Sequence, residues 1–315
     1  MPVPRLALAA VLSFALLGAG GALAAPTPSG DLEPYAGSFA QVDRTTAWEL
    51  ARRTPIDFET YHPQGFALVG ERIFMSSVEI TEAPVKYPEP VDGYDRTTGQ
   101  GVGHVFVMTR EGKLIKDIEV GEGAMYHPGG IDFDGESLWV PVAEYRPDSQ
   151  GIVYRLDPDT LEVREAFRHD DHIGGTVADP DTGLVHGVTW GSRTLLTWNR
   201  KGDLLSQREN PDHMLDYQDC AYAGDGSQLC SGITGLPTAT AGSYELGGLA
   251  LTGLRDGAVR HEVPFPRFSS AGHVVTRNPV ALELDGGTLR MFAAPDDSDE
   301  VAGTELLVYE SQPTG

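Results

Sequence analysis

Three histidines, His62, His127 and His172, each open one of a set of similar segments, and two of these segments end on a glutamate, Glu79 and Glu144. Neutral imidazoles combined with carboxylates suit zinc, manganese or iron better than calcium, which prefers oxygen ligands. A metal held by the three histidines would polarise a carbonyl group or lower the pKa of a bound water, with Glu79 or Glu144 as the general base. These residue types predict metal-assisted hydrolysis of a small ester or lactone.

The segments repeat along the chain, and their period defines the fold. Each has a small residue, a β run, a polar turn and a second β run, as in HPQGFALVGERIFMSSVE (62–79), HPGGIDFDGESLWVPVAE (127–144), and the segments at 172–190, 217–234 and 277–297. A second kind of hairpin lies between them, at 103–120, 151–167, 193–209 and 247–265. Four strands in a unit of about 45 residues are typical of a β-propeller blade.

The two ends of the repeat array predict the number of blades. The final strand TELLVYE (304–310) has no later partner, and AWELARRTPIDF (47–58) has no earlier one. Pairing the two strands in one blade closes the ring without an exposed edge. The sequence therefore predicts an all-β protein, a single β-propeller domain at 45–315 with five blades. Six blades are the alternative if the Pro- and Gly-rich segment 79–102 hides another blade instead of a loop.

Propeller geometry predicts where the functional residues meet. An antiparallel hairpin returns the chain to its starting face, so the inner strands start, and the second strands end, around one axis. We expect His62, His127 and His172 as metal ligands and Glu79 and Glu144 as catalytic groups at this face. Four further positions, with the same placement, are expected to bind a ligand: Tyr217, Trp190, Arg277 and Asp296. Loops at 80–102, 145–150 and 235–246 would wall the face.

Other interpretations of the same residues stay open. The two glutamates could act without metal as the acid/base pair of a glycoside hydrolase. The face could instead be a ligand- or protein-binding site without catalysis, and a buried histidine could serve packing through a hydrogen bond to a neighbouring blade. The chain has no GxSxG, P-loop, HExxH, GxGxxG or CxxC motif, which leaves several enzyme classes without their signature.

The repeated HPxG starts and the DGExLWV second strand resemble a family of uncharacterised, mostly bacterial, secreted propeller proteins. The same motifs are more distantly similar to those of gluconolactonase and strictosidine-synthase-like propellers. The resemblance covers most of residues 60–310 and implies a propeller. Gluconolactonase-like enzymes have six blades and hold calcium with Glu, Asn and Asp, whereas the matching positions here carry histidine.

The N-terminus and the composition predict an exported protein. Residues 1–24 have one arginine, an apolar run and a small-x-small site, the layout of a signal peptide, and 25–44 is expected to be a flexible segment. The formal net charge of −23 disfavours nucleic acid and anionic membranes. Cys220 and Cys230 flank a short turn, which predicts a disulfide in an oxidising compartment. We expect a monomer, secreted or periplasmic, with no membrane attachment after signal removal.

Overall fold

The computed structural model describes residue 1 and residues 33–239, 242–300 and 302–311. The predicted signal peptide lies outside these residues, apart from Met1. Among the residues described, no helix is long and apolar enough to cross a bilayer. The regular elements of the described residues are β-strands, apart from one short helix, α1 (Ala36–Phe39), and one 3-10 turn, η1 (Trp190–Ser192).

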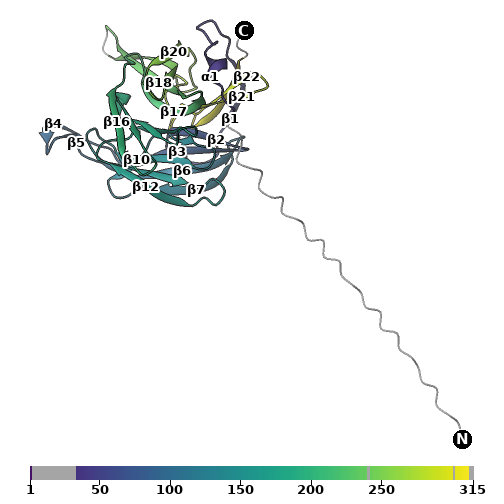
Figure 1. The fold of residues 1–315 in the computed structure, drawn as a ribbon, viewed down its shortest axis with the longest axis horizontal. Coiled ribbons are helices and arrows are strands. Elements are labelled where there is room, and N and C mark those ends of the chain that lie inside the picture. Colours follow the sequence, from purple (N-terminus) through teal and green to yellow (C-terminus); the bar gives the residue numbers. More distant parts are fainter. Residues whose placement is uncertain (2–32, 240–241, 301, 312–315) are drawn as a thin grey trace.

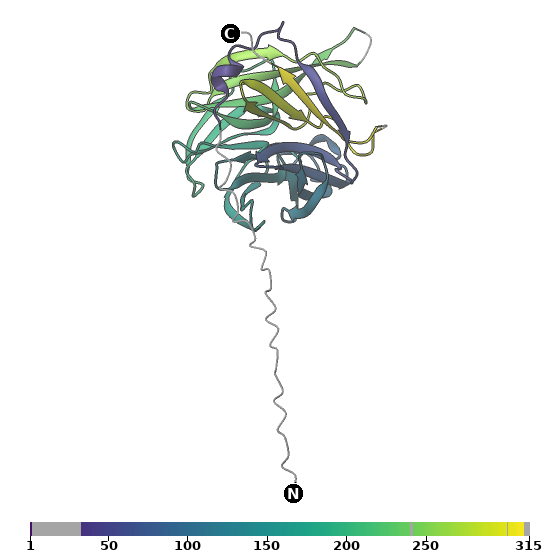
Figure 2. The same cartoon turned by 90° about the vertical axis from the view of Figure 1, so that its right-hand side faces the viewer.

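Five antiparallel sheets form a five-bladed β-propeller, which confirms the predicted fold and blade number (Figure 1 and Figure 2). The first two blades, from the axis outward, consist of β2 (His62–Val69), β3 (Arg72–Glu82), β6 (Gln100–Thr109) and β7 (Leu114–Val120), and of β8 (Met125–Pro128) with β9 (Asp132–Phe133), β10 (Leu138–Glu144), β11 (Gly151–Leu156) and β12 (Val163–His169).

The next two blades follow the same order along the chain. They consist of β13 (Gly175–Ala178), β14 (Val185–Val188), β15 (Thr194–Trp198) and β16 (Leu204–Glu209), and of β17 (Asp216–Gly224), β18 (Ser227–Pro237), β19 (Ser243–Gly253) and β20 (Val259–Pro264).

The fifth blade closes the ring with both ends of the domain. Its strands are β21 (Val280–Asp285), β22 (Thr288–Ala293), β23 (Glu305–Ser311) and, outermost, β1 (Glu49–Pro55). Strand β1 pairs antiparallel with β23, from Glu49 opposite Glu310 to Pro55 opposite Glu305. The predicted closure is confirmed. Strand β1 thus covers the edge that β23 would otherwise expose.

Apolar side chains fill the space between neighbouring blades. Each of five buried clusters joins two adjacent blades, and Trp139 and Trp198, for example, lie in the cluster between the second and third blades. The cluster between the fourth and fifth blades also takes in Tyr35, Phe39 and Val42. Residues 33–44, the described part of the segment expected to be flexible, are therefore packed against the propeller, and this differs from the expectation.

The glycine of the HPxG motif has a steric role near the axis. A Cβ atom on Gly65 would lie 2.6 Å from the backbone nitrogen of Ile131 in the next blade, and one on Gly130, the equivalent glycine of that blade, would lie 2.7 Å from Oδ1 of Asp219. Real Cβ atoms do not approach other heavy atoms this closely, because the cores of proteins are already close-packed. The repeated glycine lets the inner strands meet at the axis.

Two buried carboxyl groups link all five blades at the axis. The Oδ2 atom of Asp132 accepts hydrogen bonds from the backbone of Ala178 (3.1 Å) and Tyr222 (3.3 Å). The Oδ2 atom of Asp219 accepts bonds from the backbone of Phe66 (2.8 Å) and Val280 (3.3 Å). Burial raises the pKa of Asp132 to about 8 and raises that of Asp219 well above its ordinary value.

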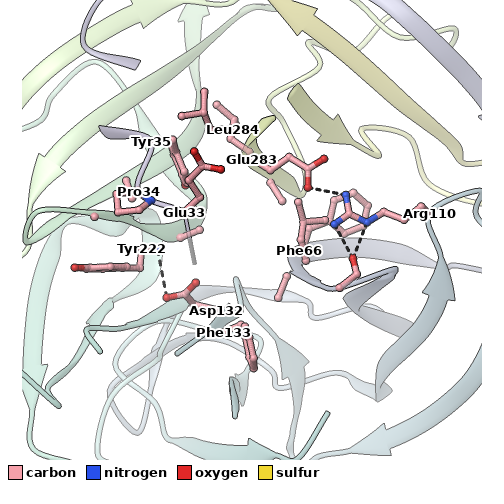
Figure 3. A pocket seen from close by; sticks show the side chains of 18 residues that line it. Glu33, Pro34, Tyr35, Phe66, Arg110, Asp132, Phe133, Tyr222, Glu283 and Leu284 are labelled. Carbon is pink, nitrogen blue, oxygen red and sulfur yellow. Dashed lines mark hydrogen bonds and ion pairs between the residues drawn. The ribbon is translucent and has the colours of Figure 1, made fainter. Parts of the chain in front are cut away.

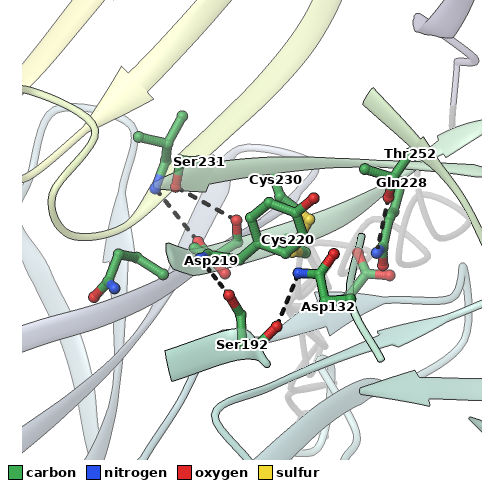
Figure 4. The surroundings of a disulfide bond; sticks show 12 residues. Asp132, Ser192, Asp219, Cys220, Gln228, Cys230, Ser231 and Thr252 are labelled. Carbon is green, nitrogen blue, oxygen red and sulfur yellow. Dashed lines mark hydrogen bonds between the residues drawn. A yellow bond between two sulfur atoms is a disulfide. The ribbon is translucent and has the colours of Figure 1, made fainter. Parts of the chain in front are cut away.

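Cys220 and Cys230 form the predicted disulfide in the inner hairpin of the fourth blade (Figure 4). The two residues are direct partners in the register of β17 and β18, and Asp225 and Gly226 make the turn with positive φ angles of 53° and 60°. These angles fit the tight hairpin turns in which Asp-Gly is common. Figure 4 shows Asp219, which belongs to this hairpin, and Asp132 in the surroundings of the disulfide.

Candidate functional site

A cavity of about 250 Å³, here called the axial pocket, lies where the inner strands of the first four blades start. It is lined by residues at or near the starts of β2, β8, β13 and β17 and by residues after β10 and β14: His62, Gln64, His127, Gly129, Tyr145, His172, Gly174, Thr189, Trp190, Gly191, Asp216, Tyr217 and Gln218. The three predicted histidines, Trp190 and Tyr217 thus share one cavity.

His127 is a buried imidazole of the pocket whose second nitrogen is unpaired. The residue is 6% exposed, its Nε2 atom has no hydrogen-bond partner, and its ring stacks on Tyr145 at a centroid distance of 4.1 Å. Burial, followed by the nearness of His172 and His62, holds its pKa well below the ordinary value. His127 is therefore neutral at physiological pH, and this lining residue of the pocket has a buried, unsatisfied nitrogen.

His172 is fixed in one tautomer by the backbone. Its Nδ1 atom lies 2.9 Å from the carbonyl oxygen of Glu144, so Nδ1 carries the proton and Nε2 keeps a free lone pair. Burial lowers its pKa to about 4. The rings of His127 and His172 are 6.4 Å apart. The pocket wall thus offers two neutral imidazoles that accept hydrogen bonds.

His62 is held by a carboxylate that the sequence did not single out, Asp297. The distance from Nδ1 of His62 to Oδ1 of Asp297 is 2.7 Å. Burial alone would raise the pKa of Asp297, but the hydrogen bond and charge of His62, with smaller effects of Arg277 and Asn278, lower it overall. An ionised Asp297 orients the His62 ring through this hydrogen bond.

Aromatic rings and a guanidinium group form the outer wall. Tyr145 and Trp190 have centroids 5.7 Å apart, and Arg96 lies 4.9 Å above the Trp190 ring. Arg96 belongs to the hairpin of β4 (Lys86–Val91) and β5 (Tyr94–Arg96), inside the segment expected to be a loop that walls this face. The hairpin, seen at the edge of the molecule in Figure 1, supplies one side chain to the pocket rim.

Gln64 and Gln218 line the pocket because of two β-bulges. Each is the residue skipped in the register of its hairpin, between Pro63 and Gly65 and between Tyr217 and Asp219. A bulge re-aims a side chain that regular alternation would place elsewhere. The amide nitrogens donate to the carbonyl oxygens of Pro63 and Asp216, which leaves the amide oxygens for a ligand. The residue types at these positions do not predict a bulge.

The two glutamates do not line the pocket. Val78, rather than Glu79, pairs with His62, and Ala143, rather than Glu144, pairs with His127. A register difference of one residue turns a side chain to the other face of the strand. We expected Glu79 in register with His62 and Glu144 in register with His127. In the structure each glutamate lies one residue beyond that position.

Each glutamate has a partner of its own. The Oε2 atom of Glu79 is 4.0 Å from Nε2 of His104, and Oε2 of Glu144 is 2.5 Å from Nε of Arg146. A glycosidase pair needs both carboxyl groups facing the substrate, and the two side chains do not provide this geometry.

The remaining predicted residues divide between the pocket and its surroundings. Tyr217 lines the pocket, and burial with the charge of Asp212 raises the pKa of its hydroxyl group. Arg277 and Asp296 lie outside the lining: Arg277 is 3.7 Å from a carboxylate oxygen of Glu300, and Oδ2 of Asp296 accepts a bond of 3.5 Å from the backbone of Ala271. The structure does not bring these two into the axial pocket.

The histidines do not already meet as a metal centre. Among the described residues, the one group of three or more His, Cys, Asp and Glu whose ligand atoms all lie within 4.8 Å is elsewhere, at His273, Asp296 and Glu300. The ring nitrogens of His62, His127 and His172 would have to move closer to hold one ion. Their Nδ1 partners, Asp297 and the Glu144 carbonyl, are nevertheless of the kind that orients metal-binding histidines.

A second cavity of about 240 Å³ lies toward the other end of the inner strands (Figure 3). It is bounded by Asp132, Phe66 and Tyr222, and by Glu33 and Tyr35 from the N-terminal segment. The backbone nitrogen of Tyr35 donates to the carbonyl oxygen of Ala223 at 2.9 Å, which holds this segment at the cavity. No sequence pattern predicts this contact, because no repeat includes residues 33–44.

The fold and the axial pocket define a five-bladed propeller with a small-molecule-sized site at its axis. The chain belongs to the family of unknown function DUF6454, whose profile matches residues 30–312. No curated protein sequence matches the chain.

Several solved structures are similar at low identity. An α-L-arabinofuranosidase from Fusarium graminearum is 7% identical with a TM-score of 0.48, and the match covers 84% of this chain and 98% of that one. A luciferin-regenerating enzyme is 12% identical with a TM-score of 0.44, and the match covers 84% of this chain and 96% of that one. The hydrazine synthase of Kuenenia stuttgartiensis is 13% identical with a TM-score of 0.39. The match covers 76% of this chain and 57% of that one, so this chain spans little more than half of that one. The activities of these proteins are not carried over.

Proposed function

We propose that the axial pocket binds a small polyhydroxylated molecule of about monosaccharide size. The observation that carries this proposal is the unpartnered Nε2 atom of His127 at the wall of a cavity that also receives the free lone pair of His172. A buried nitrogen without a partner costs about 1–3 kcal/mol, and a ligand hydroxyl group that donates to it removes this cost.

The chemistry of the lining sets the ligand class. Acceptors predominate, namely two neutral imidazoles, the amide oxygens of Gln64 and Gln218 and the carboxylate of Asp216. Tyr145 and Trp190 add aromatic faces against which the C–H groups of a sugar ring can pack. The volume of about 250 Å³ is just below the range of about 300–1,000 Å³ for drug-sized ligands, which favours a single small ring.

Metal-assisted hydrolysis of a small ester or lactone is the second candidate. The observation that favours it is that His62 and His172 each have an oxygen partner at Nδ1, which leaves Nε2 for a zinc, manganese or iron ion together with His127. Such an ion would supply a hydroxide nucleophile or polarise the carbonyl group. In this candidate His62 is a metal ligand oriented by Asp297, and Glu79 and Glu144, which do not line the pocket, do not act as the base.

Export also remains a proposal. The disulfide and the N-terminal sequence favour an oxidising compartment outside the cytoplasm. The strongly acidic composition favours a soluble monomer that does not bind nucleic acid. A ligand at the axis would then come from the surroundings of the cell.

A direct test compares two buried histidines. His186 is also buried, its pKa is lowered to about 4 by burial, and its Nε2 atom has no partner, but it lies outside the axial pocket. Calorimetric titration of the parent, His127→Gln and His186→Gln with neutral monosaccharides, amino sugars and sugar lactones gives the comparison. We expect one or more ligands to bind the parent and His186→Gln, with at least ten-fold weaker binding to His127→Gln.

The same samples separate the two candidates. Release of acid from sugar lactones, dependent on added zinc or manganese, would favour the hydrolase, whereas binding without turnover would favour the binding protein. If no ligand binds the parent, or if His127→Gln binds as tightly as the parent, the proposed site is wrong.

A further inference from the structure

We propose a second, separate site for a divalent transition-metal ion, formed by His273, Asp296 and Glu300 beside the fifth blade. His273 lies on the segment before β21, and Asp296 and Glu300 lie on the segment between β22 and β23. One ligand atom of each residue lies within 4.8 Å of the other two, so a single ion can contact all three with small side-chain movements. Here the ligand atoms are already close, unlike those of the axial histidines.

Asp296 supplies the independent sign of a ligand. The residue is 1% exposed, and its Oδ1 atom is buried without any hydrogen-bond partner. Its carboxyl group has a long contact from Oδ2 to the backbone of Ala271, at 3.5 Å, and a hydrogen bond with the side chain of Ser269. A buried carboxyl oxygen without a partner is costly in either protonation state, and a cation removes that cost.

His273 and its second neighbour fit a ligand role. The Nε2 atom lies 2.6 Å from Oε1 of Glu300, while Nδ1 lies 3.7 Å from Oε2 of Glu245 on β19. Without an ion, Nε2–H donates to Glu300; an ion that displaces this proton would take the Nε2 lone pair, with the ring proton on Nδ1, the nitrogen nearer Glu245. Glu245 is then a positioning residue of the carboxylate–histidine type found behind metal ligands.

The donor set favours manganese or zinc over calcium. One imidazole nitrogen with two carboxylates suits a borderline transition metal, whereas calcium prefers six or more oxygen ligands. The guanidinium group of Arg277, 3.7 Å from Oε1 of Glu300, is the competing cation at this place. The ion pair of Arg277 is with Glu300, and Oδ1 of Asp296 is left without a hydrogen-bond partner.

The position of the ion connects it to the axial pocket. Asp297, next to Asp296, binds His62, and its backbone nitrogen donates to Oε2 of Glu300 at 3.1 Å. An ion on Asp296 and Glu300 would fix the segment that carries Asp297 and so hold the His62 ring in place. The inference does not depend on the identity of the ligand in the axial pocket.

The test uses chelator-treated full-length protein and added Mn²⁺ or Zn²⁺, followed by calorimetry and thermal melting. We expect one ion per chain in the parent and in Asp299→Asn, a charge-matched change at an exposed residue of the same segment. Asp296→Asn and Glu300→Gln should lose binding by at least ten-fold, and Glu245→Gln by about 10–100-fold, as for groups that orient metal ligands. Calcium should raise the melting temperature less than manganese.

A further variant separates this site from the axial pocket. His127→Gln should keep the ion at His273, Asp296 and Glu300, even if it loses an axial ligand or an axial metal. Mn²⁺ electron spin echo spectra should show nitrogen coupling that disappears in His273→Gln and persists in His127→Gln. Absence of stoichiometric binding to the parent, or unchanged binding in both Asp296→Asn and Glu300→Gln, would overturn the proposal.

Discussion

The buried carboxyl group of Asp132 should make the protein less stable as the pH rises above about 6.5. Its pKa in the folded state is about 8, because burial disfavours the charged form, against an ordinary value of 3.8. Between these values the folded protein keeps a proton that the unfolded chain has released. The free energy of unfolding therefore falls with rising pH, by up to about 1.4 kcal/mol per pH unit for one proton.

Histidines act in the opposite direction at lower pH. The pKa values of His172 and His186 are about 4 in the folded state, and that of His127 is also lowered, so the unfolded chain binds these protons first. Stability from these groups rises with pH up to the ordinary histidine value of 6.5 and is constant above it. The two effects together predict a stability maximum near pH 6.5, followed by a fall toward pH 8.

The assay is urea unfolding at pH 6.5, 7.0 and 7.5 for the parent, Asp132→Asn and Asp57→Asn. Asp57 is exposed, so its variant removes the same charge without affecting the axis. We expect Asp132→Asn to reduce the downward slope by up to about 1.4 kcal/mol per pH unit, while Asp57→Asn keeps the slope of the parent. Asp219, whose pKa is also raised, accounts for a remaining slope. Equal slopes in all three proteins would refute this account.

Three further predictions concern the fold. Deleting residues 45–58 removes β1 and should abolish soluble expression, and a truncated protein that melts like the parent would disprove the closure of the ring. Replacing Cys220 and Cys230 by alanine opens a loop with a sequence separation of 10, which should lower the urea-derived stability by about 3 kcal/mol; an unchanged midpoint would contradict it. Gly65→Ala should destabilise the protein by at least about 1–3 kcal/mol because its Cβ would meet the Ile131 backbone, whereas Gly37→Ala, with open space around it, should be tolerated; equal melting temperatures would be the contrary result.

The propeller could be predicted because its determinants are local and repeated. Turn residues and alternating strands recur in every blade, and the two unpaired end strands require a partner. Cys220 and Cys230 were placed opposite each other by the turn between them, and the register confirms this pairing. The three histidines occupy matching positions in successive repeats, so their convergence follows from the fold alone.

The details of the site depend on features that residue types do not reveal. Bulges at Gln64 and Gln218 bring these amides into the pocket, and a register difference of one residue turns Glu79 and Glu144 away from it. The repeat pattern predicts Asp296 as the ligand-binding residue of its segment. In the structure the next residue, Asp297, contacts His62, whereas the side chain of Asp296 contacts the backbone of Ala271.

The central claim is that neutral histidines of the axial pocket receive hydrogen bonds from a ligand. Nitrogen-15 NMR of histidine-labelled protein at pH 7, with and without each sugar and lactone, tests it most directly. The account predicts an unprotonated Nε2 signal for His127 that shifts toward a hydrogen-bonded position on addition of a ligand, with no change for His186. A protonated His127 ring, or a His127 signal that stays fixed when each ligand is present at saturating concentration, would contradict the claim.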